Sequence, residues 1–187
     1  MEIYLIRHPR VDIDSGLCYG QSDIGLSENF ITEVQHYHQN LPTDFDIIFS
    51  SPLKRCLQLA KKLDRGEIKT DARLMEINFG SWELKNWNDI PQKEIENWSK
   101  DFINYKPGGG ENLKEFHRRV LEFIAELNQT KAEKVLIVSH AGVIRCFWQY
   151  ILDIPLENIM KIPIDYGEIF KIEIHEKVSY QRILQKK

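Results

Sequence analysis

The sequence predicts an α/β fold, a three-layer sandwich in which helices cover both faces of a mostly parallel central sheet. Short, continuous runs of β-forming apolar residues lie at positions 3–6, 47–49 and 135–138. Such runs are typical of strands that are buried on both faces. Helix signals alternate with these runs along the chain, and this alternation favours helices layered against a parallel sheet.

Length and composition predict that residues 1–187 form a single domain. The chain has 187 residues, of which 42% are hydrophobic and 28% are charged. This supplies enough apolar material for a buried core and excludes a disordered or fibrous class. The 25 Lys and Arg against 28 Asp and Glu leave a net charge of -3, whereas a nucleic-acid-binding domain usually has the opposite bias.

The cysteines and the hydropathy pattern indicate the cellular compartment in which the protein is expected. Cys18, Cys56 and Cys146 are odd in number and lack paired spacing, which excludes a disulfide framework and a four-thiolate zinc site. A reducing cytoplasm is therefore the expected compartment. No run approaches the roughly 18 consecutive apolar residues that a membrane-spanning helix needs, and the first residues do not have the pattern of a leader.

Helices are expected on both sides of the second strand. Ser51 is a cap candidate, and Pro52 would occupy the first helical position. Apolar residues then recur at helical spacing as far as Leu63, which predicts a helix over residues 52–63. Residues 27–40 are expected to form another helix.

Two further helices and a pair of strands complete the expected elements. Asn112, with Glu115 three positions later, has the pattern of a capping box that opens an amphipathic helix. The helix that begins near Gly142 is apolar on so many sides that it should be largely buried. Isoleucines among charged residues at 169–174, followed by a similar stretch at 179–184, predict two terminal strands or a hairpin.

Polar and charged residues follow all three apolar strands at the point where each strand ends. Ligands of open α/β sheets bind beyond the carboxyl ends of the strands, where these segments should meet. Arginine side chains and helix N-termini both suit phosphate oxygens. We therefore expect an anion site formed by Arg7, His8, Arg10, Arg55 and His140.

Transfer of a phosphoryl group at this site needs a nucleophile and a proton donor in addition to the cations. A neutral imidazole of His8 can attack phosphorus and form a covalent intermediate. A protonated His140 would hold the charge of the phosphoryl group in flight. A carboxylic acid kept partly neutral by the nearby phosphate would protonate the leaving group, and Glu76 is the candidate. This scheme requires no metal and no cofactor.

Five segments spread over most of the chain resemble the signature of the histidine phosphatase superfamily, which includes phosphoglycerate mutases and many small phosphatases. The resemblance implies a phosphoglycerate mutase-like fold, and it singles out Glu76 among many glutamates as acid and base. It also implies His8 as the phosphorylated nucleophile, with a phosphate pocket made of Arg7, Arg55 and His140. The matching segments are residues 5–8, 50–55, 74–76 with 79–83, 107–111 and 138–142.

The segment after the expected nucleophile departs from the family pattern. The family usually has glycine directly after the histidine and a serine or threonine two positions beyond, where this chain has Pro9 and Val11. Asp14 stands where an asparagine is common. The usual hydroxyl contact is therefore missing, and Arg10 is the candidate that would compensate with charge.

Residues 7–9 together with 16–23 most resemble one subgroup, the α-ribazole phosphatases of cobalamin assembly. By position, Tyr19 and Gly20 match loop residues of the family that touch substrate. This resemblance implies removal of the 5'-phosphate from α-ribazole 5'-phosphate, or from the cobalamin made with it.

Residues 80–110 are expected to form a cap-like insert above the pocket. Trp82, Trp87 and Trp98 crowd this stretch. The rings are interpreted either as local core, for at least two of them, or as a surface that stacks on an aromatic leaving group. Residues 108–110 are interpreted as a hinge or loop that borders the site and not as a dinucleotide-binding loop.

Three kinds of function remain open from the sequence. The leading hypothesis is a phosphomonoesterase that works through phosphohistidine at His8 on α-ribazole 5'-phosphate. A broad-specificity phosphatase or a phosphoglycerate mutase would use the same residues. The alternative from another class is an inactive phospho-ligand binding module, motivated by Pro9 and Val11. The expected partner is a small-molecule phosphomonoester, with no nucleic acid and no membrane, and a homodimer is left open.

Overall fold

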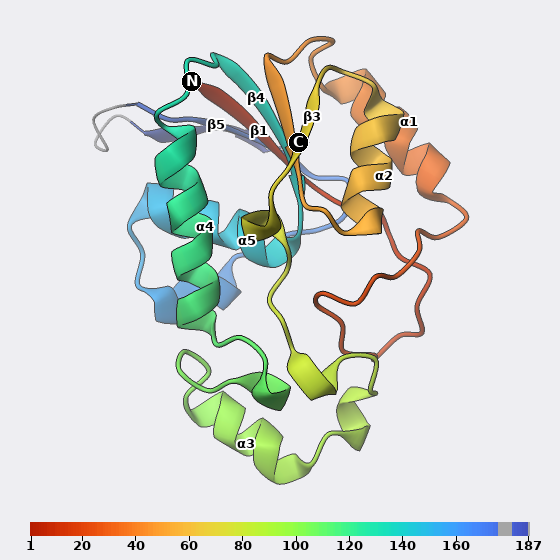
Figure 1. The fold of residues 1–187 in the computed structure, drawn as a ribbon, viewed down its shortest axis with the longest axis vertical. Helices are drawn as coiled ribbons and strands as arrows, with labels where there is room; N and C mark the ends of the chain where they lie inside the picture. The colour runs from red at the N-terminus through yellow and green to blue at the C-terminus, as the bar shows by residue number, and fades with distance from the viewer. Residues whose placement is uncertain (176–180, 187) are drawn as a thin grey trace.

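A computed structural model describes residues 1–175 and 181–186 of the chain. These residues form a six-stranded sheet in the order β3-β2-β4-β1-β5-β6, with helices on both faces (Figure 1). The first four strands of that order run parallel, while β5 is antiparallel to β1 and β6 to β5. The predicted three-layer sandwich with a mostly parallel sheet is confirmed. The strands are β1 (Glu2–Arg7), β2 (Ile47–Ser50), β3 (Ile68–Thr70), β4 (Lys134–Ser139), β5 (Ile169–Glu173) and β6 (Arg182–Lys186).

The sheet has a core on each face because alternate residues of the central strands point to opposite sides. Ile3 and Leu5 pack with the helices α4 (Leu113–Leu127) and α5 (Ala141–Leu152). Tyr4 and Ile6 pack on the other face with α1 (Phe30–Asn40) and α2 (Lys54–Leu63). This double burial explains why the central strands are continuously apolar in the sequence. No helix in the described ranges is long and apolar enough to cross a membrane.

The N-terminus of α4 is correctly predicted, whereas that of α2 is not. The Asn112 side chain accepts a hydrogen bond from the Glu115 backbone at 2.8 Å, and both halves of the capping box are present. Helix α2 begins at Lys54, two residues after the expected start at Pro52, because Leu53 is still extended. Ser51 therefore does not cap the helix. Similarly, α1 begins at Phe30 and not near residue 27.

The edges of the sheet were the hardest parts to predict. Strand β3 was not expected, because its three residues contain a single apolar side chain, Ile68. Strand β5 forms as predicted and pairs with β6 in an antiparallel arrangement. Strand β6 begins at Arg182, and the first part of the predicted stretch 179–184 lies outside the described residues.

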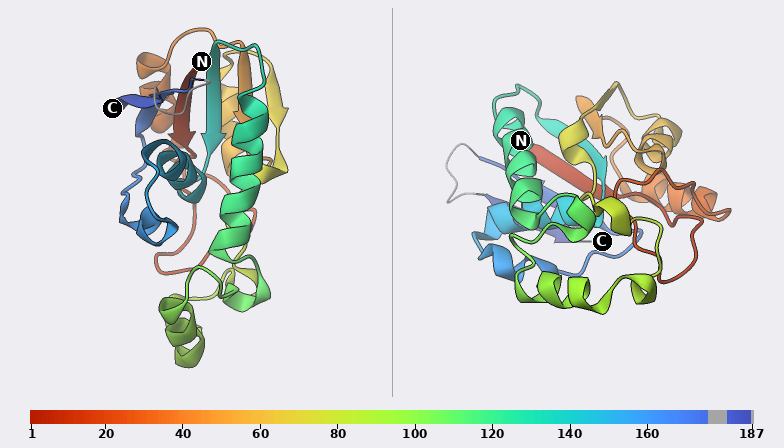
Figure 2. Two further views of the ribbon diagram at one scale, coloured as in Figure 1. Left: turned by 90° about the vertical axis from the view of Figure 1, so that its left-hand side faces the viewer. Right: turned by 60° about the horizontal axis from the view of Figure 1, so that its bottom comes forward.

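Residues 80–110 lie beyond the carboxyl ends of the central strands, away from the sheet (Figure 2). They contain the helix α3 (Gln92–Lys100) and several short 3₁₀ turns. The helix was not predicted, since it buries no residue completely and is mostly polar. The carboxyl ends of β1 and β4 point towards this segment, so it borders the edge of the sheet where a ligand is expected.

The two ends of this segment are packed against each other through glycines, and we call this contact the glycine neck (Asn78–Gly80 with Gly108–Gly110). A Cβ on Gly80 would lie 2.3 Å from the carbonyl oxygen of Gly108, and one on Gly110 would lie 2.2 Å from that of Asn78. The backbones approach too closely for any side chain. Residues 108–110 are thus a tightly packed loop at the base of the segment.

Candidate active site

The four predicted residues of the phosphate pocket lie together at the carboxyl ends of β1, β2 and β4. His8 follows β1, Arg55 is the second residue of α2, and His140 is the residue before α5. The rings of His8 and His140 have centroids 5.1 Å apart, and Arg55 Nη2 lies 3.2 Å from His140 Nδ1. The parallel arrangement of the three strands produces this meeting, because their ends share one edge of the sheet.

The hydrogen bonds of His8 leave it ready to act as a nucleophile. Its Nδ1 lies 2.7 Å from the carbonyl oxygen of Pro9, which can only accept, so Nδ1 carries the proton. The lone pair is then on Nε2. Burial lowers the pKa of His8 well below its ordinary value, and the positive charges of Arg55 and Arg7 lower it further. The neutral imidazole that attack on phosphorus requires is therefore the stable form.

His140 is also neutral in the free site, so the protonated ring expected during phosphoryl transfer stays a prediction for the site with phosphate bound. The guanidinium of Arg55 can only donate, so His140 Nδ1 accepts and Nε2–H donates to Ser51 Oγ at 2.8 Å. Burial lowers the pKa of His140 well below its ordinary value, and the positive charges of Arg55 and Arg7 lower it further. An anion in the pocket would oppose the effect of these cations.

Two arginines, the buried Arg55 and the half-buried Arg7, have no carboxylate partner among the described residues, although buried arginines usually have one. Arg55 is fully buried, and its guanidinium donates to the backbone carbonyls of Gly20 and Ser22. Arg7 donates to the carbonyl of Ile164 at 2.9 Å. Within residues 1–175 and 181–186, the buried Nε atoms of Arg7 and Arg55 have no hydrogen-bond partner. Unpaired positive donors of this kind provide a site for an anion.

The remaining predicted binding residues lie around this pocket. Arg10 is exposed at the rim, and its guanidinium carbon lies 4.9 Å from the ring of Tyr166. Gly20 is buried, and a Cβ there would lie 1.9 Å from the carbonyl oxygen of Ile77, so only glycine fits. The hydroxyl of Tyr19 lies 3.0 Å from that of Tyr166.

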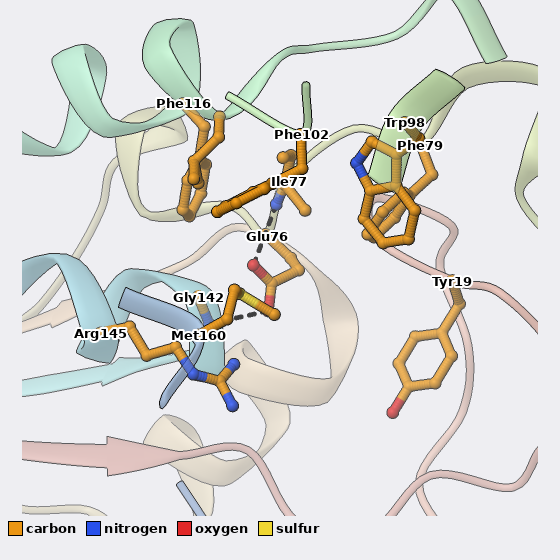
Figure 3. A pocket seen from close by; sticks show the side chains of 11 residues that line it. Tyr19, Glu76, Ile77, Phe79, Trp98, Phe102, Phe116, Gly142, Arg145 and Met160 are labelled. Carbon is orange, nitrogen blue, oxygen red and sulfur yellow. Dashed lines mark hydrogen bonds between the residues drawn. The ribbon is translucent and has the colours of Figure 1, made fainter. Parts of the chain in front are cut away.

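Glu76 lies next to the start of α5, as Figure 3 shows. One carboxylate oxygen accepts a hydrogen bond from the Gly142 backbone at 3.1 Å, and the other from the Ile77 backbone at 3.0 Å. A Cβ on Gly142 would lie 2.2 Å from Glu76 Oε1. The absence of a side chain at Gly142 therefore creates the space that the carboxylate occupies.

The segment that carries Glu76 is fixed by Arg119 of α4. Its guanidinium donates to the backbone carbonyls of Arg73 (2.6 Å), Met75 (2.8 Å) and Glu76 (2.9 Å). It also forms a two-point ion pair with Glu111, with Nε to Oε1 at 2.8 Å and Nη2 to Oε2 at 2.9 Å. This fork geometry, which only arginine provides, sets the position of the backbone at Glu76.

An apolar cavity of about 140 Å³ opens beside Glu76. One side chain in it carries a positive charge, the half-buried Arg145, whose Nε donates to the carbonyl of Ile162 at 2.8 Å. Burial lowers the pKa of Arg145. Figure 3 shows the residues that line the cavity, which are Tyr19, Glu76, Ile77, Phe79, Trp98, Phe102, Leu113, Phe116, Gly142, Arg145 and Met160.

Some aromatic side chains of residues 80–110 form local core, and others face the site. The sequence left both interpretations open. Trp82 is local core, since it is 1% exposed and its Nε1 donates to Glu94 at 2.6 Å. Trp87 packs on Trp98 with ring planes 18° apart. Trp98 and Phe102 line the cavity beside Glu76. One part of the cluster therefore holds the segment together, and another part faces the site.

Sequence reasoning missed several residues that the fold brings to this site. Arg145 is three positions after Gly142 on α5, so the helical period could have placed both on one face. Glu111 belongs to a matched segment, but its pairing with Arg119 had no local signal. Tyr166 comes from the loop before β5, which reaches the pocket only because β5 pairs with β1. Among the described residues, no group of three or more His, Cys, Asp or Glu side chains is placed to hold a metal ion.

Known proteins of similar sequence belong to one superfamily. The family model described as "Histidine phosphatase superfamily (branch 1)" matches residues 3–184. The chain is similar to the adenosylcobalamin/alpha-ribazole phosphatase of Escherichia coli (strain K12), with 31% identity over 98% of this chain and 95% of the relative. The protein of that name from Salmonella typhimurium is 28% identical over 98% and 96%.

Solved structures have the same phosphoglycerate mutase-like fold. The crystal structure of the alpha-ribazole phosphatase from Shigella flexneri superimposes with a TM-score of 0.86 at 29% identity, covering 94% of this chain and 92% of that one. The match extends over the sheet, both helical layers and nearly the whole length of the chain. The protein with this pocket of two histidines and two unpaired arginines belongs to the histidine phosphatase superfamily and is a phosphoric monoester hydrolase of that metal-independent family.

Proposed function

We propose that this protein removes the phosphate of α-ribazole 5'-phosphate, or of the cobalamin made with it, in the assembly of the cobalamin nucleotide loop. The observation that carries this proposal is the apolar cavity beside Glu76, with aromatic side chains in its lining, because such a lining suits a leaving group that carries a flat, apolar base. The names of the relatives from E. coli and Salmonella support the same substrate.

In the proposed first step, His8 Nε2 attacks phosphorus while the bond between phosphorus and the leaving oxygen breaks. Arg7 and Arg55 would hold the non-reacting oxygens and stabilise the charge that they carry. Glu76 would give a proton to the leaving oxygen, so that the substrate departs as an alcohol. The product of this step is phosphohistidine at His8.

In the proposed second step, water replaces the imidazole on phosphorus. Glu76, now a carboxylate, would take a proton from the attacking water, which restores the acid for the next cycle. The bond between Nε2 and phosphorus breaks, and inorganic phosphate is released. The hydrogen bond from Nδ1 to the Pro9 carbonyl at 2.7 Å supports both steps. It fixes the orientation of the imidazole ring, so that the Nε2 lone pair stays directed at phosphorus.

We also propose that residues 80–110 act as a cap that selects the leaving group. Trp98 and Phe102 come from this segment and line the cavity, where they would stack on the benzimidazole-like base. The Trp98→Leu change should therefore narrow the preference for α-ribazole 5'-phosphate over an alkyl phosphate and leave the rate on the alkyl phosphate nearly unchanged.

A second candidate, a broad phosphatase or a phosphoglycerate mutase, is favoured by one observation, the guanidinium of Arg145 in the cavity. Arginine binds carboxylates with two parallel hydrogen bonds, so a small substrate such as 3-phosphoglycerate would find a partner here. If this candidate is correct, Arg145→Met should reduce turnover of 3-phosphoglycerate far more than turnover of an aryl phosphate.

The test is a steady-state comparison of α-ribazole 5'-phosphate, 3-phosphoglycerate, phosphoserine and simple aryl phosphates in the presence of a chelator. We expect kcat/KM to be highest for α-ribazole 5'-phosphate. A preference below about tenfold, near 1.4 kcal/mol in transition-state binding, contradicts the proposed substrate. The mechanism is tested separately with His8→Ala, which should abolish turnover of every substrate and any acid-labile phosphoprotein; activity in this variant contradicts the role of His8.

A further inference from the structure

Tyr166 lies against three cationic or nucleophilic residues of the phosphate pocket. Its ring centroid is 3.8 Å from the guanidinium carbon of Arg7 and 4.9 Å from that of Arg10. The same ring meets the ring of His8 edge-on, with centroids 5.8 Å apart. Stacking on the guanidinium of the half-buried Arg7 is a favourable contact for a tyrosine ring. Tyr166 therefore forms a wall of the pocket on the side of Arg7.

Tyr19 occupies the corresponding position on the side of Arg55. Its ring centroid is 5.5 Å from the guanidinium carbon of Arg55, and its hydroxyl lies 3.0 Å from the hydroxyl of Tyr166. The two phenols thus form a bridge between the two arginines. Tyr19 also lines the apolar cavity, so this bridge lies at the boundary between the phosphate pocket and the space for the leaving group.

The bridge of Tyr19 and Tyr166 has one hydroxyl proton left to donate. Each hydroxyl has one proton, and the bond between the two hydroxyls uses one of them, whichever residue donates. The second proton is left for another acceptor. Burial raises the pKa of Tyr19 to about 12, and its hydrogen bond with Tyr166 contributes to this. The Tyr19 phenol therefore keeps its proton at neutral pH.

We propose that Tyr166 is a phosphate-binding residue of this enzyme. With Tyr19 it forms a relay of two hydroxyls that donates one hydrogen bond to a non-reacting phosphoryl oxygen held between Arg7 and Arg55. The ring of Tyr166 keeps the Arg7 guanidinium in place while this bond forms. The pair supplies a hydroxyl contact to the phosphate from loops that are 147 residues apart in sequence.

The test is the inhibition constant of inorganic phosphate, measured in competition with a simple aryl phosphate. Tyr166→Phe keeps the ring on Arg7 and removes the hydroxyl, so this Ki should rise about tenfold, the size expected for a hydrogen bond to a charged group. The two hydroxyls donate a single hydrogen bond to phosphate. The double variant, Tyr19→Phe with Tyr166→Phe, should therefore weaken phosphate binding no more than the single variant with the higher Ki. Tyr150→Phe is the matched control, since its hydroxyl binds Asn128 and Gln181 away from the pocket.

A Ki of inorganic phosphate for Tyr166→Phe that stays within twofold of that of the original protein overturns the proposal. This holds even if Tyr166→Leu binds phosphate more weakly, because that result would mean that only the ring contributes to binding. Strictly additive effects of the two Phe substitutions also overturn it, because they mean that the hydroxyls act separately. This readout uses inorganic phosphate and an aryl phosphate, so it does not depend on whether α-ribazole 5'-phosphate is the preferred substrate.

Discussion

Two protons decide what the phosphate pocket can do, one on His8 Nδ1 and one on His140 Nε2. The first is held by a backbone carbonyl at 2.7 Å and the second by a serine hydroxyl at 2.8 Å. The carbonyl belongs to Pro9, and proline lacks only the backbone N–H, so it can accept this bond as any residue can. The departure at position 9 therefore leaves the orientation of the proposed nucleophile, His8, intact.

Arg119 is expected to be a positioning residue for the proposed acid Glu76. Lysine at position 119 keeps the charge but loses the fork that binds Glu111 and three backbone carbonyls. The Glu76 backbone should then shift, and protonation of the leaving group should suffer most. We expect Arg119→Lys to lower kcat about tenfold or more on an alkyl phosphate and only about two- to threefold on 4-nitrophenyl phosphate, whose leaving group hardly needs a proton.

The neighbouring residue supplies the matched control, because Arg118 is exposed and Arg118→Lys should leave both rates unchanged. Steady-state kinetics on the two substrates measures the difference. An equal loss on both would mean that Arg119 supports the fold generally and does not position the acid.

At the scale of elements, the start of α5 combines a helix N-terminus with a position that has no side chain. The backbone of Gly142 donates to Glu76, and a Cβ at this position would also lie 3.0 Å from the Phe116 ring. Alanine is favoured over glycine within a helix by about 1 kcal/mol. The preference of the helix and the space required by the carboxylate are therefore in conflict at this position.

Gly142→Ala should separate these two effects. We expect kcat to fall more than about tenfold because the carboxylate is displaced from its productive position, while the urea midpoint changes little because the helix gains propensity. Gly25→Ala is the control, since a Cβ there would contact nothing within 4 Å. Activity close to that of the original protein in Gly142→Ala would show that the position of Glu76 is not critical.

The elements that the sequence predicted are those with strong local signals. Strands β1, β2 and β4 are buried on both faces and are recognisable from composition alone, and the cap of α4 follows from Asn112 and Glu115. Strand β3 is a short edge strand, and α3 is a polar helix, so neither has a pattern. The pocket residues that directly follow strands were found, whereas Tyr166 and Arg119 reach the site through tertiary pairing that no local pattern encodes.

At the scale of the whole molecule, the net charge of -3 describes the surface and not the site. Arg7, Arg55, His8 and His140 lie at one edge of the sheet, and three of them are buried at 2% exposure or less. Burial of the Arg55 guanidinium without a carboxylate partner opposes folding. The proposed anion site is therefore formed before its ligand binds, and it lowers the stability of the fold at this edge of the sheet.

This arrangement predicts an acid-sensitive fold. The pKa of both His8 and His140 is lowered in the folded protein, whereas unfolded histidine has a pKa near 6.5. Below about pH 6.5 the two histidines bind protons in the unfolded chain but not in the folded chain, so the free energy of unfolding should fall as the pH falls, by about 2–3 kcal/mol between pH 7.5 and 5.5. Urea denaturation at the two pH values measures this loss.

Inorganic phosphate should reduce the loss, because an anion in the pocket stabilises the folded form and favours protonated histidine. His140→Gln removes one of the two groups and should flatten the dependence on pH. An unchanged slope in this variant would mean that other groups cause the acid sensitivity.

The glycine neck holds the two ends of residues 81–107 close together. Because the chain leaves and rejoins the sheet region at two backbones in direct contact, residues 81–107 begin and end at nearly the same place. Segments of other lengths can close the same gap without moving the strands, since loop-closure entropy grows slowly with length. If residues 80–110 select the leaving group as proposed, a chimera that carries a relative's segment in place of residues 81–107 should keep its phosphate chemistry and take on the alcohol preference of that relative.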